Sequence, residues 1–200
     1  MRSRKAARCW YRAGRMRSIL IGLVFLCTGL LASCGGSGSG YGPEERAAYA
    51  PIIESPESMA AFYGGATYKS YSRAHGTQIE YLASNGRAYL WYPGNTRVVP
   101  GRWKTDQDPA GNVLMCFRYG ANTYNPVTRR GGGDWECQSG IAHTLMAGEV
   151  RDGDPLGLAS GQIPFVLPRG DDIGIEAAMA RAGKSQAINP DKATWRPFPI

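Results

Sequence analysis

Residues 77–92 read TQIEYLASNGRAYLWY and decide the fold class. Two runs rich in aromatic and aliphatic residues, Thr77–Ala83 and Arg87–Tyr92, flank Ser84-Asn85-Gly86. Asn-Gly between two such runs is the strongest short signal for a β-hairpin, because both residues tolerate positive φ. The stretch therefore predicts two antiparallel strands joined by a tight turn.

The same pattern continues on both sides of the hairpin. Aromatic and β-branched runs separated by turn residues predict further strands near Thr67–Arg73, Arg97–Val99, Gly101–Thr105, Val113–Tyr119, Trp135–Ser139, Ile141–Met146 and Gln162–Leu167. Asp106–Asn112 predicts a turn, and Asn122–Asp134 predicts a longer loop. We expect a mainly β protein: a small antiparallel β-meander or barrel-like sheet with one or two short flanking helices.

Two short helices are predicted beside the sheet. Ser55 is suited to be an N-cap, and Pro56 follows at the first helical position. Three apolar residues then share one helical face: Met59, Phe62 and Tyr63. Nearer the C-terminus, Asp172–Ala182 predicts a second helix that an aspartate caps and Gly183 ends.

The N-terminal segment has the three parts of an export signal. A basic stretch reaches Arg17, an apolar run covers Ile19–Leu31, and the small residues Ala32-Ser33 precede Cys34. The apolar run is shorter than the roughly 20 residues of a transmembrane helix. Leu31-Ala32-Ser33-Cys34 resembles the bacterial lipobox, which implies that residues 1–33 are removed and that Cys34 carries the lipid. An ordinary cleaved signal and an uncleaved anchor helix are the alternatives.

The net charge of +7 is carried by the N-terminal segment. Residues 1–33 hold 7 of the 23 Lys and Arg residues and no acidic residue, so residues 34–200 carry 16 basic and 16 acidic side chains. A neutral domain lacks the excess positive charge with which proteins bind nucleic acid, so we expect no nucleic-acid partner. Residues 34–42 are a Gly/Ser-rich tether, and we expect residues 43–200 to form a single β-rich periplasmic domain with an irregular C-terminal tail.

Five cysteines are present, and two of them are candidates for a disulfide. Cys9 and Cys27 leave with the signal and Cys34 is acylated, which leaves Cys116 and Cys137 in an oxidising compartment. We expect these two to form a disulfide. A metal site is disfavoured because the chain has no CxxC spacing around them.

The segment Gln78–Cys137 resembles an uncharacterised family of small exported proteobacterial β-meander proteins. The shared features are Gly101-Arg102-Trp103, Cys116-Phe117-Arg118-Tyr119 and Trp135-Glu136-Cys137. The resemblance covers about a third of the chain. It implies a small sheet stapled by the two cysteines, and it implies no activity.

Signals for catalysis are sparse. His75 and His143 lie in different predicted segments, and a surface or structural role is the simpler one for each. The sequence contains no Gly-x-Ser-x-Gly, His-Glu-x-x-His or Walker motif. Asp106-Gln107-Asp108 and Asp152-Gly153-Asp154 lack the later ligands of a calcium loop and predict turns. We expect no cofactor and no metal.

The body of the chain is rich in aromatic residues. Alternate residues of a strand share a face, so one aromatic set packs in the core and another is a candidate surface for a glycan, peptide or protein. The candidate binding surface combines the hairpin with the Asn122–Asp134 loop: Tyr89, Trp91, Tyr92, Tyr124, Arg129 and Arg130. Residues 129–133, RRGGG, could cradle an anion, although a loop tip is their simpler role.

These features together predict a lipoprotein that faces the periplasm. The lipid anchor makes the membrane its first partner, and Gly35 after Cys34 favours the outer membrane by the same lipobox resemblance. We expect a binding or envelope-structural module, with an envelope protein or a glycan as partner, rather than an enzyme. The alternatives are a module resembling the periplasmic lysozyme inhibitors and an enzyme acting on the cell wall.

Overall fold

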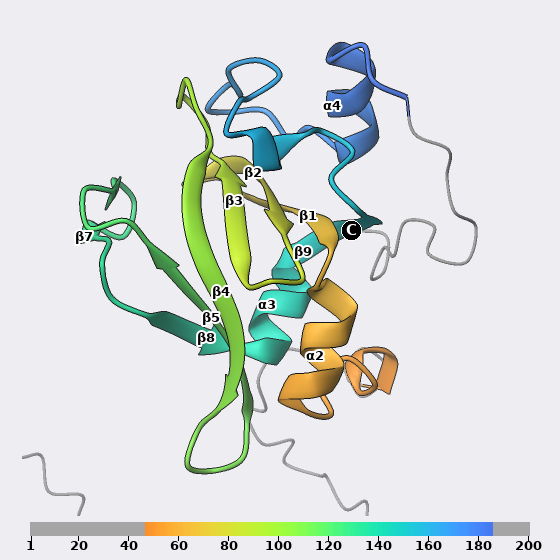
Figure 1. Ribbon diagram of the computed structural model, residues 1–200, viewed down its shortest axis with the longest axis vertical. Helices are drawn as coiled ribbons and strands as arrows, with labels where there is room; N and C mark the ends of the chain where they lie inside the picture. Colours follow the sequence, from red (N-terminus) through yellow and green to blue (C-terminus); the bar gives the residue numbers. More distant parts are fainter. Residues whose placement is uncertain (1–46, 186–200) are drawn as a thin grey trace, which may run out of the picture. The chain divides into compact units, whose positions relative to one another are not determined.

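The structure, a computed structural model, describes residues 47–185. Within this range seven strands form one antiparallel sheet in the order β8-β5-β4-β3-β2-β1-β9, and the sheet curls into a half-barrel (Figure 1). Its strands are β1 (Ala66–Ser72), β2 (Gly76–Leu82), β3 (Arg87–Trp91), β4 (Val99–Gln107), β5 (Val113–Tyr119), β8 (Glu136–Ser139) and β9 (Ala147–Asp152). The mainly β, barrel-like fold expected from the sequence is confirmed.

The central hairpin forms as its sequence predicts. Strands β2 and β3 pair with Leu82 opposite Ala88 and Ile79 opposite Trp91. Gly86 closes the turn at φ 78°, in the left-handed region that favours glycine. The Asn-Gly signal therefore located the turn correctly.

The strand expected at Ile141–Met146 is wrong, because helix α3 (Gly140–Met146) occupies this position. Its buried residues follow the helical spacing i, i+3, i+4: Gly140, His143 and Thr144. Gly140 also allows close packing, since a Cβ there would lie 3.0 Å from the sulfur of Met59. The strand that follows α3 is β9, which pairs with β1 and forms one edge of the sheet.

Helices α2 (Pro56–Tyr63) and α3 cover one face of the sheet (Figure 1). Helix α2 begins as predicted, with the Ser55 side chain accepting a hydrogen bond from the Ser58 backbone N–H at 3.0 Å. The core on this side combines α2 with residues from the strands and the loop before α2: Ile52, Met59, Tyr63, Ala66, Tyr68, Leu82, Ala88, Trp103, Val113, Met115, Ala147 and Val150.

The C-terminal segment covers part of the opposite face. It contains the 3-10 helix η1 (Leu158–Ser160) and helix α4 (Ile175–Arg181), with irregular backbone where a strand at Gln162–Leu167 was expected. That expectation is wrong because the segment packs on the sheet with its side chains instead of pairing with an edge. The core on this side combines residues of the sheet with residues of the C-terminal segment: Ile79, Trp91, Val98, Leu156, Leu158, Leu167 and Ala178.

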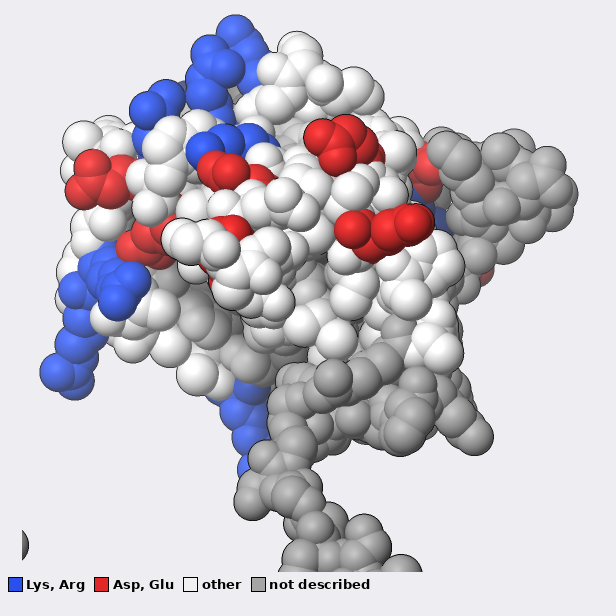
Figure 2. Space-filling view, turned by 90° about the horizontal axis from the view of Figure 1, so that it is seen from below, with Lys and Arg blue, Asp and Glu red and all other residues white. Residues whose placement is uncertain are grey.

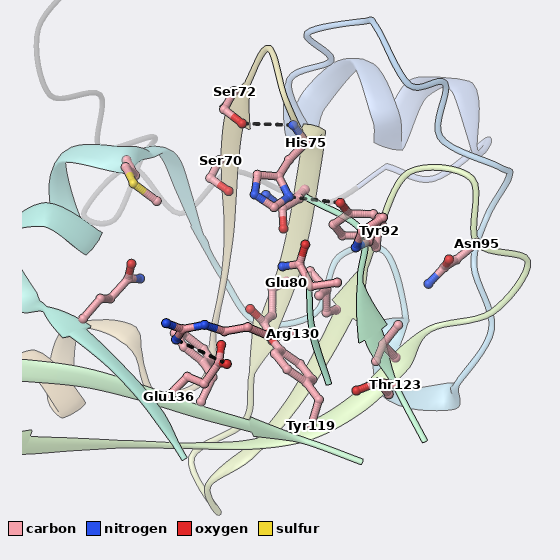
Figure 3. A pocket seen from close by; sticks show the side chains of 18 of the residues that line it. Ser70, Ser72, His75, Glu80, Tyr92, Asn95, Tyr119, Thr123, Arg130 and Glu136 are labelled. Carbon is pink, nitrogen blue, oxygen red and sulfur yellow. Dashed lines mark hydrogen bonds and ion pairs between the residues drawn. The ribbon is translucent and has the colours of Figure 1, made fainter. Parts of the chain in front are cut away.

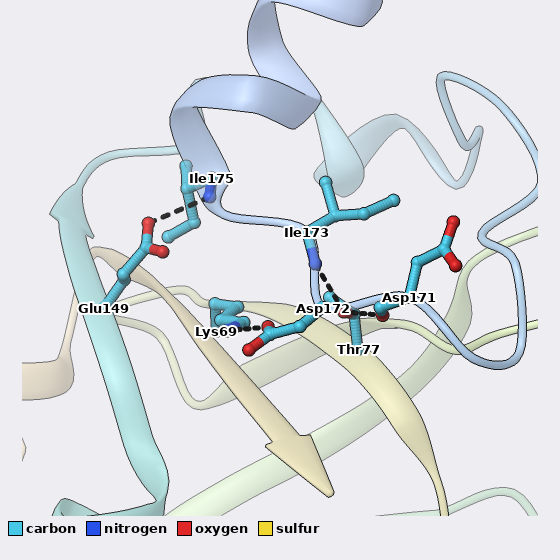
Figure 4. A network of polar contacts seen from close by, with 7 residues as sticks. All are labelled: Lys69, Thr77, Glu149, Asp171, Asp172, Ile173 and Ile175. Carbon is cyan, nitrogen blue, oxygen red and sulfur yellow. Dashed lines mark hydrogen bonds and ion pairs between the residues drawn. The ribbon is translucent and has the colours of Figure 1, made fainter. Parts of the chain in front are cut away.

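Polar contacts fix the C-terminal segment to the sheet (Figure 4). Asp172 does not cap a helix as expected, because its carboxylate forms an ion pair with Lys69. Helix α4 begins three residues later, and the Glu149 carboxylate accepts the Ile175 backbone N–H at 2.9 Å. The Thr77 hydroxyl adds two hydrogen bonds. It donates to the Asp171 carbonyl and accepts the backbone N–H of Ile173. The helix therefore depends on a carboxylate from β9 for its N-terminal hydrogen bond.

The predicted disulfide is present between Cys116 and Cys137. The two residues are register partners on β5 and β8. The loop between them contains the short antiparallel pair β6 (Tyr124–Asn125) and β7 (Arg130–Gly131). The bridge therefore joins the edge strand β8 to the sheet on either side of this loop.

Charged side chains of both signs are interspersed on the face shown in Figure 2. This agrees with the equal numbers of acidic and basic residues in residues 34–200. None of the helices in the described range is long and apolar enough to span a membrane. The expected signal peptide, Cys34 and the tether lie outside the described residues.

Candidate functional site

The candidate site lies on the concave face of the curled sheet. Strand register places Tyr68, Glu80 and Tyr119 on one face. The Tyr119 hydroxyl on β5 donates to Glu80 on β2 at 2.7 Å, although β3 and β4 lie between these strands. Neighbouring strands are ~4.8 Å apart, so a flat sheet would separate β2 and β5 by ~14 Å. The contact shows that this face is concave.

Core side chains fill one end of the concave face, and the other end is open. Ala66, Leu82 and Ala88 lie in the core beside α2, at the closed end of β1, β2 and β3. At the opposite end, Ser70 and Leu90 line a pocket of about 760 Å³. This volume is in the range of small-molecule sites, roughly 300–1,000 Å³. The half-barrel therefore provides a cavity that the side chains of residues 47–185 leave unfilled.

Glu80 is a buried acid in the pocket wall. It is only 2% exposed, and both of its carboxylate oxygens accept tyrosine hydroxyls at 2.7 Å, one from Tyr68 and one from Tyr119. Burial raises the pKa of Glu80 to about 7, and the two hydroxyl bonds oppose that rise. Burial and the neighbouring carboxyl hold the pKa of both tyrosines well above the usual value. Glu80 thus changes charge near neutral pH.

His143 lies on the same side of the pocket, inside a group of aromatic rings. Its ring centroid is 4.9 Å from those of Tyr63 and Tyr68 and 5.7 Å from that of Phe117. Burial lowers its pKa to about 3, so the imidazole is neutral at physiological pH. The side-chain nitrogen of Gln138 lies 2.9 Å from Nδ1, while Nε2 has no partner among the described residues. The structural role expected for His143 fits this environment.

His75 lies elsewhere in the pocket wall (Figure 3). Its Nδ1 is 3.0 Å from the Tyr92 hydroxyl, and its backbone N–H donates to the Ser72 hydroxyl. Partial burial lowers the pKa of this histidine. His75 and Tyr92 form a hydrogen-bonded pair that connects the end of β3 to the turn between β1 and β2.

The loop after β5 forms another part of the rim. It folds back on itself, because the backbone N–H of Gly132 donates to the Thr123 carbonyl at 3.0 Å. A Cβ at Gly132 would lie 2.3 Å from the Gly120 carbonyl oxygen, so only glycine fits there. Arg130 and Glu136 face each other across the rim at 3.8 Å and are mostly solvent-exposed (Figure 3). The loop therefore brings charge to the mouth of the pocket.

The structure places only part of the predicted binding surface at this pocket. Tyr92, Tyr124 and Arg130 line it, and Tyr124 is 64% exposed. The prediction that Trp91 belongs to the binding surface is wrong, because the side chain is fully buried under the C-terminal segment. Its indole N–H donates to the Phe165 carbonyl there. Tyr89 points to that same opposite face and stacks on Tyr81.

Arg129 and the glycine-rich stretch do not form an anion cradle of their own. Arg129 is exposed, and its φ of 58° places it in the turn before β7. Arg130 and Gly131 belong to β7 and pair with β6.

Groups of three or more residues that could hold a metal ion are absent from residues 47–185. The two aspartate pairs expected to be turns are turns only in their second halves, because Asp106 and Gln107 end β4 and Asp152 ends β9. The turn after β4 begins at Asp108, which accepts the backbone N–H groups of Ala110 and Asn112.

Sequence analysis missed the buried polar residues of the pocket. Gln78 and Glu80 alternate with Ile79 and Tyr81, a pattern that is typical of a strand with a solvated polar face. In the structure both faces of β2 are covered, so the polar residues of this strand point into the pocket. The sequence feature that could have indicated a buried Glu80 is the presence of two tyrosines on other strands, Tyr68 and Tyr119, whose hydroxyls donate to its carboxylate.

Comparison with known proteins provides no relative from which to assign this site. No family model, curated protein or solved structure matches the chain. The function proposed for the pocket therefore rests on its geometry and on the sequence.

Proposed function

We propose that this protein is a lipid-anchored binding module of the bacterial envelope, and that the open end of its half-barrel holds the ligand. The observation that carries the proposal is the 760 Å³ pocket with Glu80 buried in its wall. A sheet whose only task was structural would gain stability by filling this space with apolar side chains. The protein instead keeps a buried acid there.

The proposed anchor rests on the N-terminal sequence. Residues 1–33 have the parts of an export signal, and residues 31–34, LASC, resemble a lipobox. Several acyl chains hold a protein at a membrane far more firmly than one does, because each buried CH₂ contributes ~0.8 kcal/mol. The lipid on Cys34 would keep the pocket at the membrane surface facing the periplasm, with the outer membrane favoured.

Binding is favoured over catalysis by the state of the titratable groups. Both oxygens of Glu80 already accept hydroxyl groups, and His143 is neutral and enclosed by rings. His75 is engaged with Tyr92. A general base needs to reach the proton that it removes, and the contacts of the two histidines orient both of them toward the protein itself. Glu80 keeps a second acceptor site on each oxygen for a ligand. These groups are better suited to recognising a ligand than to transferring its protons.

Two tryptophan variants of strand β3 test the proposal. Leu90 lies beside Glu80 on the concave face and lines the pocket, whereas Arg87 is exposed on the opposite face of the same strand. Leu90→Trp should fill the pocket and fail to complement a deletion strain, while Arg87→Trp should complement it. Both variants must fractionate with membranes and incorporate labelled palmitate, which Cys34→Ser should abolish. Full complementation by Leu90→Trp would refute the pocket as the functional site.

A further inference from the structure

We infer that the pocket recognises a ligand through a positively charged amino or guanidino group, which the Glu80 carboxylate holds. This inference rests on the proposed function and specifies the chemistry of its ligand. It places the cation on a buried acid, inside a wall of aromatic rings. The expected ligand class is a small organic cation or a molecule that ends in one.

Glu80 has no positively charged partner in the part of the chain that the structure describes. Four ion pairs form among residues 47–185, and none of them includes this residue. A carboxylate removed from water is costly unless a charge or several hydrogen bonds compensate it. Tyr68 and Tyr119 supply one bond to each oxygen, and each oxygen has a second acceptor site. A ligand with N–H donors and a positive charge supplies what the protein leaves out.

The aromatic lining favours the same charge. Tyr68, Tyr92, Phe117 and Tyr119 line the pocket around Glu80. The faces of aromatic rings carry negative potential, so they attract cations, with ~0.5–2 kcal/mol for a ring within about 6 Å of the charge. An ammonium or guanidinium group held by Glu80 would therefore lie in a pocket that aromatic rings also line.

The arginines of the pocket lie at its mouth. Arg130 pairs with Glu136 and is 70% exposed. The Arg169 guanidinium lies against the turn at Gly94, and burial raises the pKa of the Tyr92 hydroxyl, a rise that the charge of Arg169 opposes. The positive groups are therefore separated from Glu80, and they would contact an anionic or polar part of the ligand that extends toward solvent.

Proton uptake by Glu80 provides a signature for this recognition. The titratable groups that contact it are Tyr68 on β1 and Tyr119 on β5, and His143 on α3 packs behind Tyr68. The two tyrosines and the histidine keep one protonation state between pH 5.5 and pH 8, because their pKa values are shifted outside that interval. Only the ionised acid holds a cation, so Glu80 alone should make cation binding roughly 30-fold tighter over this interval for a pKa of about 7. A proton on His75 in the same pocket wall, whose pKa burial lowers, would weaken cation binding at the acidic end in the same direction.

Three matched probes test the inference on the full chain extracted in a nonionic detergent: n-butylamine, n-butanol and butyrate. They share a carbon chain and differ in charge. We expect n-butylamine to bind at least about tenfold more tightly than the other two at pH 8, a difference of about 1.4 kcal/mol. Glu80→Gln should remove this preference. The matched control Glu54→Gln, an exposed carboxyl outside the pocket lining, should keep it.

Each outcome bears on the inference. Binding of n-butanol or butyrate as tight as that of n-butylamine, or no binding of any probe, would overturn it. Where Glu80→Gln does not fold, the pH series of the unmodified protein decides, and n-butylamine affinity that is constant from pH 5.5 to pH 8 also overturns it. The proposed function is judged separately, because the pocket-filling test on β3 needs no assumption about the charge of the ligand.

Discussion

The pH dependence of stability should show two buried groups that oppose each other. The pKa of Glu80 is about 7 in the folded protein against 4.5 for its ordinary value, so the folded state holds a proton that the unfolded state has lost between these pH values. Stability from this group is complete below pH 4.5 and is lost as the pH rises through 7. At 1.36 kcal/mol per pKa unit, the loss is about 3 kcal/mol.

His143 acts with the opposite sign. Its pKa is about 3 in the folded protein against an ordinary value of 6.5. The unfolded state therefore binds the proton first, and the stability that this group contributes is lost as the pH falls from 6.5 toward 3, by about 5 kcal/mol. Between pH 4.5 and pH 6.5 the two slopes cancel, so the pair leaves no net slope in this interval of the unmodified protein, and one slope remains on each side of it.

Glu80→Gln should reveal the contribution of Glu80 to the pH dependence of the free energy of unfolding, which His143 masks in the unmodified protein. The free energy of unfolding of this variant, relative to the unmodified protein, should rise by about 3 kcal/mol between pH 4.5 and pH 7.5. Urea unfolding of the full chain, followed by circular dichroism at four pH values, measures the difference. Glu54→Gln, which removes an exposed carboxyl before α2, controls for the loss of one charge. A Glu80→Gln difference that stays constant within about 0.5 kcal/mol would refute the account of Glu80.

Three further changes test the packing of the sheet. Reduction of the Cys116–Cys137 bridge should lower the free energy of unfolding by about 3 kcal/mol, seen as a lower urea midpoint, because 21 residues separate the two cysteines. Trp91→Ala should cost about 3–5 kcal/mol, since the side chain is fully buried, and a loss under 1 kcal/mol would contradict that burial. Arg102 lies opposite one arginine on β3 and another on β5; Arg102→Glu should stabilise by about 0.5 kcal/mol at low salt, an effect that 1 M salt should remove.

The sequence predicted the elements that depend on local signals. The Asn85-Gly86 turn, the Ser55 cap and most of the strand pattern of residues 67–119 need only neighbouring residues, and they are present. The strands expected at Arg97–Val99 and Gly101–Thr105 are one continuous strand, β4, which begins at Val99. The predicted disulfide followed from the count of cysteines left after export. These features place the sheet and its first helix without any knowledge of tertiary contacts.

The failures depend on contacts between distant segments. Residues 141–146, IAHTLM, fit a strand or a helix equally well, and packing of the helix against Met59 and β5 decides between them. The start of α4 is set by Glu149, which lies 26 residues from Ile175. Trp91 was assigned to the surface because nothing local shows that the C-terminal segment covers it. Glu80 was missed for the same reason, since curling of the sheet encloses it.

We propose the open concave end of the half-barrel as the place where this protein binds its ligand. The most direct measurement places a photoreactive phenylalanine analogue at position 90, inside the pocket, and in a second variant at position 87, on the opposite face of the same strand. After irradiation of living cells, intact-mass spectrometry of the purified protein reports any captured molecule. We predict a discrete adduct at position 90 and none at position 87. Equal labelling at both positions, or no adduct at position 90, would contradict the account.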